Sequence, residues 1–193
     1  TDFIMMVEDT SYMFVTGPNV VKTVTHEEVS SEELGGASTH SSKSGVAHFS
    51  CANEVALIED LKTLLSYMPQ NCEEDAPINP YTISNEHRKN LNNIIPENPN
   101  QPYDIKEVID EITDKDSFFE VHKNYAENIV CGFARMAGKS IGVVANQPAI
   151  LAGVLNAIGT LFLRISNNYS IFSLIALIFY GSNFFFFKIS LKN

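Results

Sequence analysis

The sequence predicts an α/β fold, because strand-like and helix-like segments alternate along it. Residues 3–7 and 12–16 are short apolar runs typical of strands, and the first is apolar throughout, as in sheets that are buried on both faces. Residues 53–68 have the three- and four-residue apolar spacing of a helix. Residues 128–146 hold two more strand-like runs around an Ala-Gly pair, which predicts a hairpin.

Short helices are expected between the first strands and the long helix. Residues 17–18 (Gly-Pro) end the strand at 12–16, and Asn19 is a fair N-cap for the helical pattern that follows. Thr25–Glu28 and Ser30–Glu33 both match the capping box, in which a hydroxyl and a carboxylate bond backbone N–H groups reciprocally. We therefore interpret these acidic residues as caps on a solvated face rather than as catalytic groups.

The helix at residues 53–68 has the clearest pattern in the chain. Asn53 can cap its start and Pro69 ends it. Its apolar residues recur on one face: Val55, Ile58, Leu61, Leu65 and Met68. This spacing predicts that the stripe packs in a core and is not part of a cofactor site.

Residues 69–102 contain six of the eight prolines and few apolar clusters, which is typical of a linker or a surface excursion. A new helix is expected to open at Asp104, with Glu107 completing a cap. In the hairpin that follows, Gly132 and Gly142 mark bulges or close backbone approaches.

Charge and cysteine content exclude several kinds of protein. All 23 Asp and Glu residues and 10 of the 13 Lys and Arg residues lie in residues 1–155, which therefore carry a net charge of −13. A nucleic-acid binder would need a basic face instead. The three cysteines are odd in number and far apart, so we expect no disulfide framework, no zinc or other metal site, and a reducing compartment. The chain begins Thr1-Asp2 without a signal peptide, and we expect it to be a piece of a longer protein.

The composition changes abruptly near Leu155. Residues 165–187 form an uncharged run of 23 residues that ends in four phenylalanines, long enough for a membrane span but diluted by Asn, Ser and Gly. Three interpretations compete for this tail: a membrane anchor, a buried helix, or a non-native sequence from a frameshift, an intron or a decayed gene. The third is favoured.

A glycine-rich polar loop at Glu32–Ala47 is the main candidate for a functional site. It holds three glycines, five Ser or Thr residues and His40 within sixteen positions. Glycine lets a backbone turn sharply or lie against a ligand. His40 is either a ligand hydrogen bonder or a structural histidine in a polar loop, and the structural role is favoured. Nothing nearby has the spacing that would activate a nucleophile, and the loop lacks a P-loop lysine.

Two long stretches of sequence resemble a known family. The stretch TDFIMMVEDTSYMFVTGPNVVKTVTHEEVSSEELGGASTHSSKSGVAH and the later NYAENIVCGFARMAGKSIGVVANQPAILAGVL look like the carboxyltransferase (β) subunit of biotin-dependent acyl-CoA carboxylases, of the propionyl-CoA carboxylase type. The resemblance covers about residues 1–155, in order and spacing, and stops near Leu155.

The resemblance implies a crotonase-like (ClpP/crotonase) carboxyltransferase fold of the α/β class, here incomplete. Residues 1–68 would be the last part of a first crotonase-like domain, 69–102 the inter-domain linker and 103–155 the start of a second domain. Residues 156–193 would be the divergent apolar tail.

The family moves a carboxyl group from carboxybiotin to the α-carbon of a short acyl-CoA such as propionyl-CoA. The resemblance implies that the glycine-rich turns that stabilise the two oxyanions lie outside this chain, so no catalytic residue is assigned and the chain alone should be inactive. It also implies an acyl-CoA pocket wall formed by Gly17, Pro18, Gly35, Gly36, His40 and Gly45.

The same resemblance implies partners and a location. No cofactor binds directly; carboxybiotin would arrive as a co-substrate on a biotin-carrying α subunit, and the intact parent would form homo-oligomers. The location would be the cytoplasm in a bacterium or the mitochondrial matrix in a eukaryote. The alternative hypothesis is a non-catalytic, membrane-tethered interaction module anchored by residues 165–187.

Overall fold

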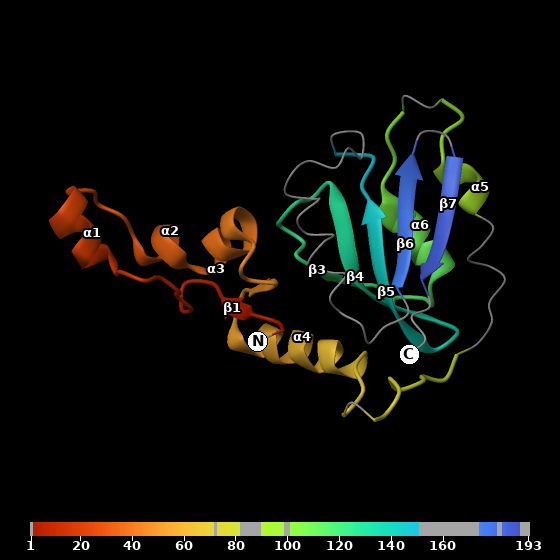
Figure 1. Cartoon of the computed structure of the whole chain (residues 1–193), viewed down its shortest axis with the longest axis horizontal. Coiled ribbons are helices and arrows are strands. Elements are labelled where there is room, and N and C mark those ends of the chain that lie inside the picture. Colours follow the sequence, from red (N-terminus) through yellow and green to blue (C-terminus); the bar gives the residue numbers. More distant parts are fainter. Residues whose placement is uncertain are drawn as a thin grey trace. The chain divides into compact units, whose positions relative to one another are not determined.

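A computed structural model describes residues 2–71, 73–81, 90–98 and 101–150, and the backbone of two further strands at 174–180 and 183–189. The chain divides into two compact units, each considered by itself (Figure 1). The first comprises Thr1–Lys62 and His122–Tyr125, and the second comprises the remaining residues.

The first unit is built on a pair of short parallel strands, β1 and β2, in which Met5 lies opposite Phe49. Its elements are β1 (Met5–Val7), α1 (Pro18–Thr25), α2 (Ser31–Gly35), α3 (Ala37–Thr39), the π-helical turn η1 (His40–Ser44), β2 (Phe49–Cys51) and most of α4 (Glu54–Ser66). Met6, Ala37 and Ala47 form a small core between the strands and the glycine-rich loop.

The second predicted strand is wrong. At residues 12–16 the structure has only an isolated bridge between Tyr12 and Gly36, and the Met13 N–H donates to the Gly35 carbonyl at 2.8 Å. Val15 and its neighbours are exposed, so this apolar run lacks a neighbouring strand among the described residues. An apolar run shows that a segment would gain from burial but does not supply its partner.

Two of the predicted helix starts are also corrected. Helix α1 has Gly17 as its N-cap and Pro18 in its first turn, where the missing N–H costs nothing, rather than Asn19 as the cap. The box at Thr25–Glu28 does not form, because the Thr25 hydroxyl donates back to the Val21 carbonyl at 3.0 Å.

The capping box at Ser30 is confirmed. The Glu33 N–H donates to the Ser30 hydroxyl at 3.2 Å, and the Ser30 N–H donates to the Glu33 carboxylate at 3.0 Å. Helix α2 then ends at Gly35, as the glycine pair predicts.

Helix α4 is also confirmed, with the Asn53 side chain accepting the Ala56 N–H at 2.9 Å. However, its apolar stripe is not core within the described residues. The side chain that α4 buries is Leu64, whereas Val55, Ile58, Leu61 and Leu65 are exposed.

Among its described residues, the second unit is a mixed sheet with one short and one longer helix. Its strands lie in the order β3 (Phe119–Val121), β4 (Ile129–Met136), β5 (Lys139–Asn146), β6 (Leu174–Tyr180) and β7 (Asn183–Ile189), antiparallel except between β5 and β6. The predicted hairpin is β4–β5. Its turn residues Ala137 and Gly138 have φ of 52° and 76°, the positive values that a type I′ turn requires.

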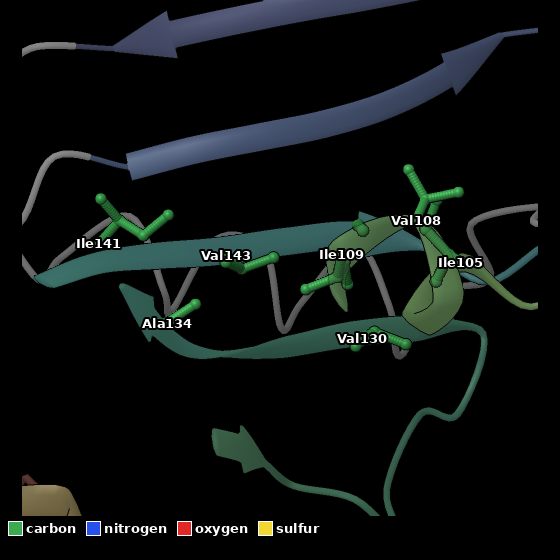
Figure 2. Packing of buried hydrophobic residues seen from close by; sticks show 8 residues of the cluster. Ile105, Val108, Ile109, Val130, Ala134, Ile141 and Val143 are labelled. Carbon is green, nitrogen blue, oxygen red and sulfur yellow. The ribbon is translucent and has the colours of Figure 1, made fainter. Parts of the chain in front are cut away.

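The core of this unit lies between helix α6 (Ile105–Ile112) and the β4–β5 hairpin (Figure 2). One face of α6 contributes Ile105, Val108 and Ile109, which are almost completely buried. They pack with the hairpin residues Val130, Ala134, Ile141, Val143 and Ala145, and the short helix α5 (Leu91–Ile94) adds to the edge of this core.

The described part of the tail is strand rather than helix. Strand β6 pairs in parallel with β5, and β7 pairs with β6, so both continue the hairpin's sheet. Within the part of the chain that the structure describes, no helix is long and apolar enough to span a membrane. Residues 165–173 and 181–182 of the expected span lie outside it, and the non-native origin of the tail stays a prediction.

A buried amide closes the start of α6. Gln147, only 5% exposed, accepts the Ile105 N–H at 3.1 Å and donates to the Asp104 carboxylate at 2.7 Å. The same carboxylate oxygen accepts the Lys106 N–H at 2.9 Å, so Asp104 caps the helix as predicted, but the described contacts include no capping box with Glu107. Two N–H groups of the first turn, which have no partner within the helix, are satisfied in this way.

We predict that Gln147→Leu lowers the free energy of unfolding by about 1–3 kcal/mol, because it leaves a buried N–H and a partly buried carboxylate oxygen each without one partner. Urea unfolding monitored by far-UV circular dichroism measures the change. Gln101→Leu, at an exposed position, is the matched control and should change stability little. Equal effects of the two substitutions would show that the amide contributes nothing specific.

Candidate functional site

All six residues of the predicted pocket wall lie in the first unit. Gly17 and Pro18 begin α1, while Gly35, Gly36, His40 and Gly45 belong to the glycine-rich loop. The Phe14 ring links the two groups, since a Cβ added at either Gly17 or Gly35 would contact it at 3.4 or 3.1 Å. The structure thus brings the two groups together through a residue that the sequence analysis did not select.

Both glycines of the pair pack closely inside the protein, Gly35 against backbone and Gly36 against a side chain that can move. A Cβ at Gly35 would clash with the carbonyl of Met13, and a Cβ at Gly36 would clash with the carboxylate of Glu32. That carboxylate also accepts the Ser38 N–H at 3.0 Å, which closes the turn between α2 and α3. The close approach that the glycines predicted is therefore made to protein atoms.

His40 fastens this loop to the segment before α1. Its Nε2 lies 2.6 Å from the Met13 carbonyl and its Nδ1 lies 2.8 Å from the Ser44 hydroxyl. Because a carbonyl oxygen only accepts, Nε2 carries the proton, and Nδ1 accepts from Ser44 when the ring is neutral. The sequence left open whether His40 binds a ligand or has a structural role, and this geometry matches the structural role.

The Ser44–His40 pair is not arranged as an activated nucleophile. The group that orients His40 is a neutral carbonyl, whereas hydrolytic triads use a carboxylate that stabilises the imidazolium. Ser44 also ends the π-helical turn η1, and such turns often occur at functional sites. The turn stops at Gly45, whose φ of 67° favours glycine and whose Cα packs against the Tyr125 ring.

A histidine pair lies next to this turn. The rings of His48 and His122 are 4.3 Å apart, and the His122 N–H donates to the His48 carbonyl at 3.1 Å. His48 Nδ1 accepts the Ile4 N–H at 3.2 Å. Burial lowers the pKa of both rings, and burial together with the charge of His48 lowers the pKa of His122 to about 4. Sequence reasoning missed this pair, because its members are far apart in the chain and neither belongs to a local motif.

A separate cavity in the second unit is unsuited to an anionic ligand. It has a volume of about 540 Å³, and four carboxylates line it together with Lys115: Glu107, Asp110, Glu111 and Asp116. Burial, and then the neighbouring carboxylates, raise the pKa of Asp110. The negative charge of the carboxylates that line this cavity would repel the phosphates of a coenzyme A. Among the described residues, no cluster of three or more His, Cys, Asp or Glu is placed to hold a metal ion.

The glycine-rich loop and the β4–β5 hairpin both fall within a match to a known family. The model of the carboxyl transferase domain matches residues 1–160. The chain belongs to this family. The family match continues past Leu155, where the resemblance was expected to stop.

Two curated carboxyltransferase relatives and one solved structure show how much of the family is present. The propionyl-CoA carboxylase beta chain of Cereibacter sphaeroides is 51% identical over 157 residues, which are 81% of this chain and 31% of that protein. The methylmalonyl-CoA decarboxylase subunit alpha of Veillonella parvula is 48% identical over 157 residues, with the same two coverages.

The solved structure is transcarboxylase 12S, crystallised as a hexamer with methylmalonyl-coenzyme A and methylmalonic acid bound. It matches with a TM-score of 0.84 at 38% identity, over 92% of this chain and 35% of that one. The α/β, crotonase-like carboxyltransferase fold is therefore confirmed. The chain spans about a third of the length of these relatives.

The lowered pKa of His122 predicts a pH-dependent stability. An unfolded histidine takes up its proton near pH 6.5 and the folded one near pH 4, so the unfolded state binds more protons between these values. The free energy of unfolding should fall by about 1 kcal/mol between pH 7 and pH 5, after allowance for partial exposure. Urea titrations at the two pH values measure this difference.

His122→Asn should reduce this pH dependence, and Asn tolerates the positive φ of 58° at that position. His26→Asn, at an exposed histidine with a φ of 61°, is the matched control and should keep it. The same pH dependence in both variants would contradict the role assigned to the histidine pair.

Proposed function

We propose that this chain is part of the carboxyltransferase component of a biotin-dependent acyl-CoA carboxylase. The supporting observation is the family match over residues 1–160, together with the close likeness to a carboxyltransferase structure that holds methylmalonyl-coenzyme A. The reaction moves a carboxyl group from carboxybiotin to the α-carbon of a short acyl-CoA. Biotin takes no part as a cofactor of this chain; it arrives as a co-substrate on the carrier domain of an α subunit.

The favoured acyl-CoA is propionyl-CoA, which carboxylation converts to methylmalonyl-CoA. The names of both relatives and the ligand of the solved structure each refer to propionyl-CoA or to methylmalonyl-CoA. Carboxybiotin breaks its N–C bond to release carbon dioxide, and the ureido anion that is left accepts a proton from the α-carbon of the acyl-CoA. The resulting enolate carbon then bonds to the carbon dioxide. Both the enolate and the biotin ureido oxygen carry negative charge in this process, and fixed N–H dipoles stabilise such oxyanions best.

The glycine-rich loop would serve as a wall of the acyl-CoA pocket rather than as the catalytic turn. Protein atoms fill the space next to Gly35, Gly36 and Gly45, so the loop is packed into one shape before any ligand arrives. His40 holds that shape through its bonds to Met13 and Ser44. The pocket wall would then comprise Gly17, Pro18, Gly35, Gly36, His40 and Gly45, with no catalytic residue among them.

The remaining partners follow from the same proposal. The intact carboxyltransferase would assemble with copies of itself and with the biotin-carrying α subunit. It would work in the cytoplasm of a bacterium or in the mitochondrial matrix of a eukaryote. No described feature favours the membrane-tethered alternative, since the part of residues 165–187 that the structure describes is strand.

A chimeric enzyme tests the proposal. Residues 1–155 of this chain replace the matching segment of the C. sphaeroides propionyl-CoA carboxylase beta chain, and carboxylation of propionyl-CoA is measured with the α subunit present. The chimera should be active. His40→Ala in the chimera should raise KM for propionyl-CoA about 10-fold and change kcat little, because it loosens the pocket wall without touching the reacting atoms.

His26→Asn, outside the loop at the end of α1, is the matched control and should leave both constants unchanged. The 193-residue chain alone should show no transfer between methylmalonyl-CoA and free biotin. An inactive chimera beside an active parent would contradict the proposed reaction, and turnover by the chain alone would contradict the absence of catalytic groups from it.

A further inference from the structure

Helix α4 presents an apolar stripe that nothing in the described structure covers. The exposed fractions are 67% at Val55, 49% at Ile58, 38% at Leu61 and 57% at Leu65. Steps of three and four residues place these side chains on one face of the helix. The other side of α4 faces β2, where the Cys51 thiol donates to the Asp60 carboxylate at 3.6 Å. One face of α4 therefore packs on β2, and the opposite, apolar face is exposed in the described structure.

The open face belongs to an incompletely covered unit. In the described part of the chain, β1 and β2 form a sheet of only two parallel strands. Parallel sheets normally have more strands and are covered on both faces. The segment before α1 is open as well, with Val15 fully exposed and Met13 42% exposed. Large apolar patches of this kind usually mark an interaction surface.

We propose that the α4 stripe is the docking surface for a segment of a carboxyltransferase subunit that lies outside these 193 residues. About 92% of the chain superposes on transcarboxylase 12S with a TM-score of 0.84, although it covers only 35% of that subunit. Most of this chain thus has a structural counterpart in a chain that also contains the other two thirds. A face left open by this third of the fold is available to the remainder.

Charge disfavours a second copy of this chain as the occupant. The first unit holds ten acidic and four basic residues, Lys123 included, a net charge of −6. Two such units facing each other through the stripe would bring like charges together, which opposes association. The expected occupant is therefore an apolar and less acidic segment of the carboxyltransferase subunit.

Coexpression tests the docking. The tagged 193-residue chain is coexpressed with the C. sphaeroides beta chain from which the matching residues are deleted, and the complex is recovered on the tag and sized by light scattering. The triple variant V55Q/I58Q/L61Q keeps good helix formers on α4 but removes the stripe. It should weaken the complex at least about 10-fold. The double variant V20Q/V24Q makes the same kind of change at exposed apolar residues of α1, outside the stripe, and should leave it intact.

Far-UV circular dichroism of each variant alone shows whether α4 still forms. If the triple variant does not fold, the single variant Leu61→Gln replaces it, with a smaller expected loss of affinity for the complex. Equal recovery with and without the stripe, or no complex with the unaltered folded chain, would overturn the proposal. So would a dimer of the chain alone that the stripe variant abolishes. The docking proposal rests on membership of the carboxyltransferase family. Its test measures recovery of a complex and not enzyme turnover, so a failed docking test can be distinguished from a failure of the proposed reaction.

Discussion

The pairing of β4 with β5 is the interaction on which most of the second unit depends. The hairpin is in register from Ile129 opposite Asn146 to Met136 opposite Lys139. Helix α6 packs its apolar face on it, β3 pairs with one of its edges and β6 with the other. The Asp114 carboxylate accepts both turn N–H groups, at 3.0 and 2.7 Å, so the hairpin is also held at its tip.

One buried cation ties the end of α4 to this hairpin. Arg135, 6% exposed, donates to the carbonyl and the hydroxyl of Ser66 at 2.9 and 3.0 Å, and lies 4.4 Å from the centre of the Tyr67 ring. Ser66 is the last residue of α4, where the helix dipole is negative, so the dipole offsets the buried charge in place of a carboxylate. No carboxylate of the described residues forms an ion pair with Arg135.

Several features with local causes could be predicted from the sequence, although the caps expected at Asn19 and Thr25 were wrong, and features with distant partners could not. The Ser30 capping box, the Asp104 cap and the hairpin turn each depend on residues within a few positions of one another. The Gln147 amide and the histidine pair bring together residues 42 and 74 positions apart, and no periodicity records such contacts.

Two of the wrong assignments, the strand at residues 12–16 and the buried stripe of α4, have a related cause. The apolar runs at residues 12–16 and along α4 show which side chains would gain from burial, but not what covers them. In the same way, Gly35 and Gly36 could be predicted as positions of close approach. Their partners, Met13 and the Glu32 carboxylate, could not be predicted.

The glycine-rich loop remains the place where fold and proposed chemistry meet, since its shape is set by protein contacts before a ligand binds. Hydrogen–deuterium exchange of the carboxyltransferase chimera, with and without saturating propionyl-CoA, tests this most directly. A pocket-lining loop predicts slower exchange in peptides that cover residues 32–47, and unchanged exchange in α6, which lies in the other unit. Unchanged exchange at residues 32–47 in the presence of bound propionyl-CoA would contradict it.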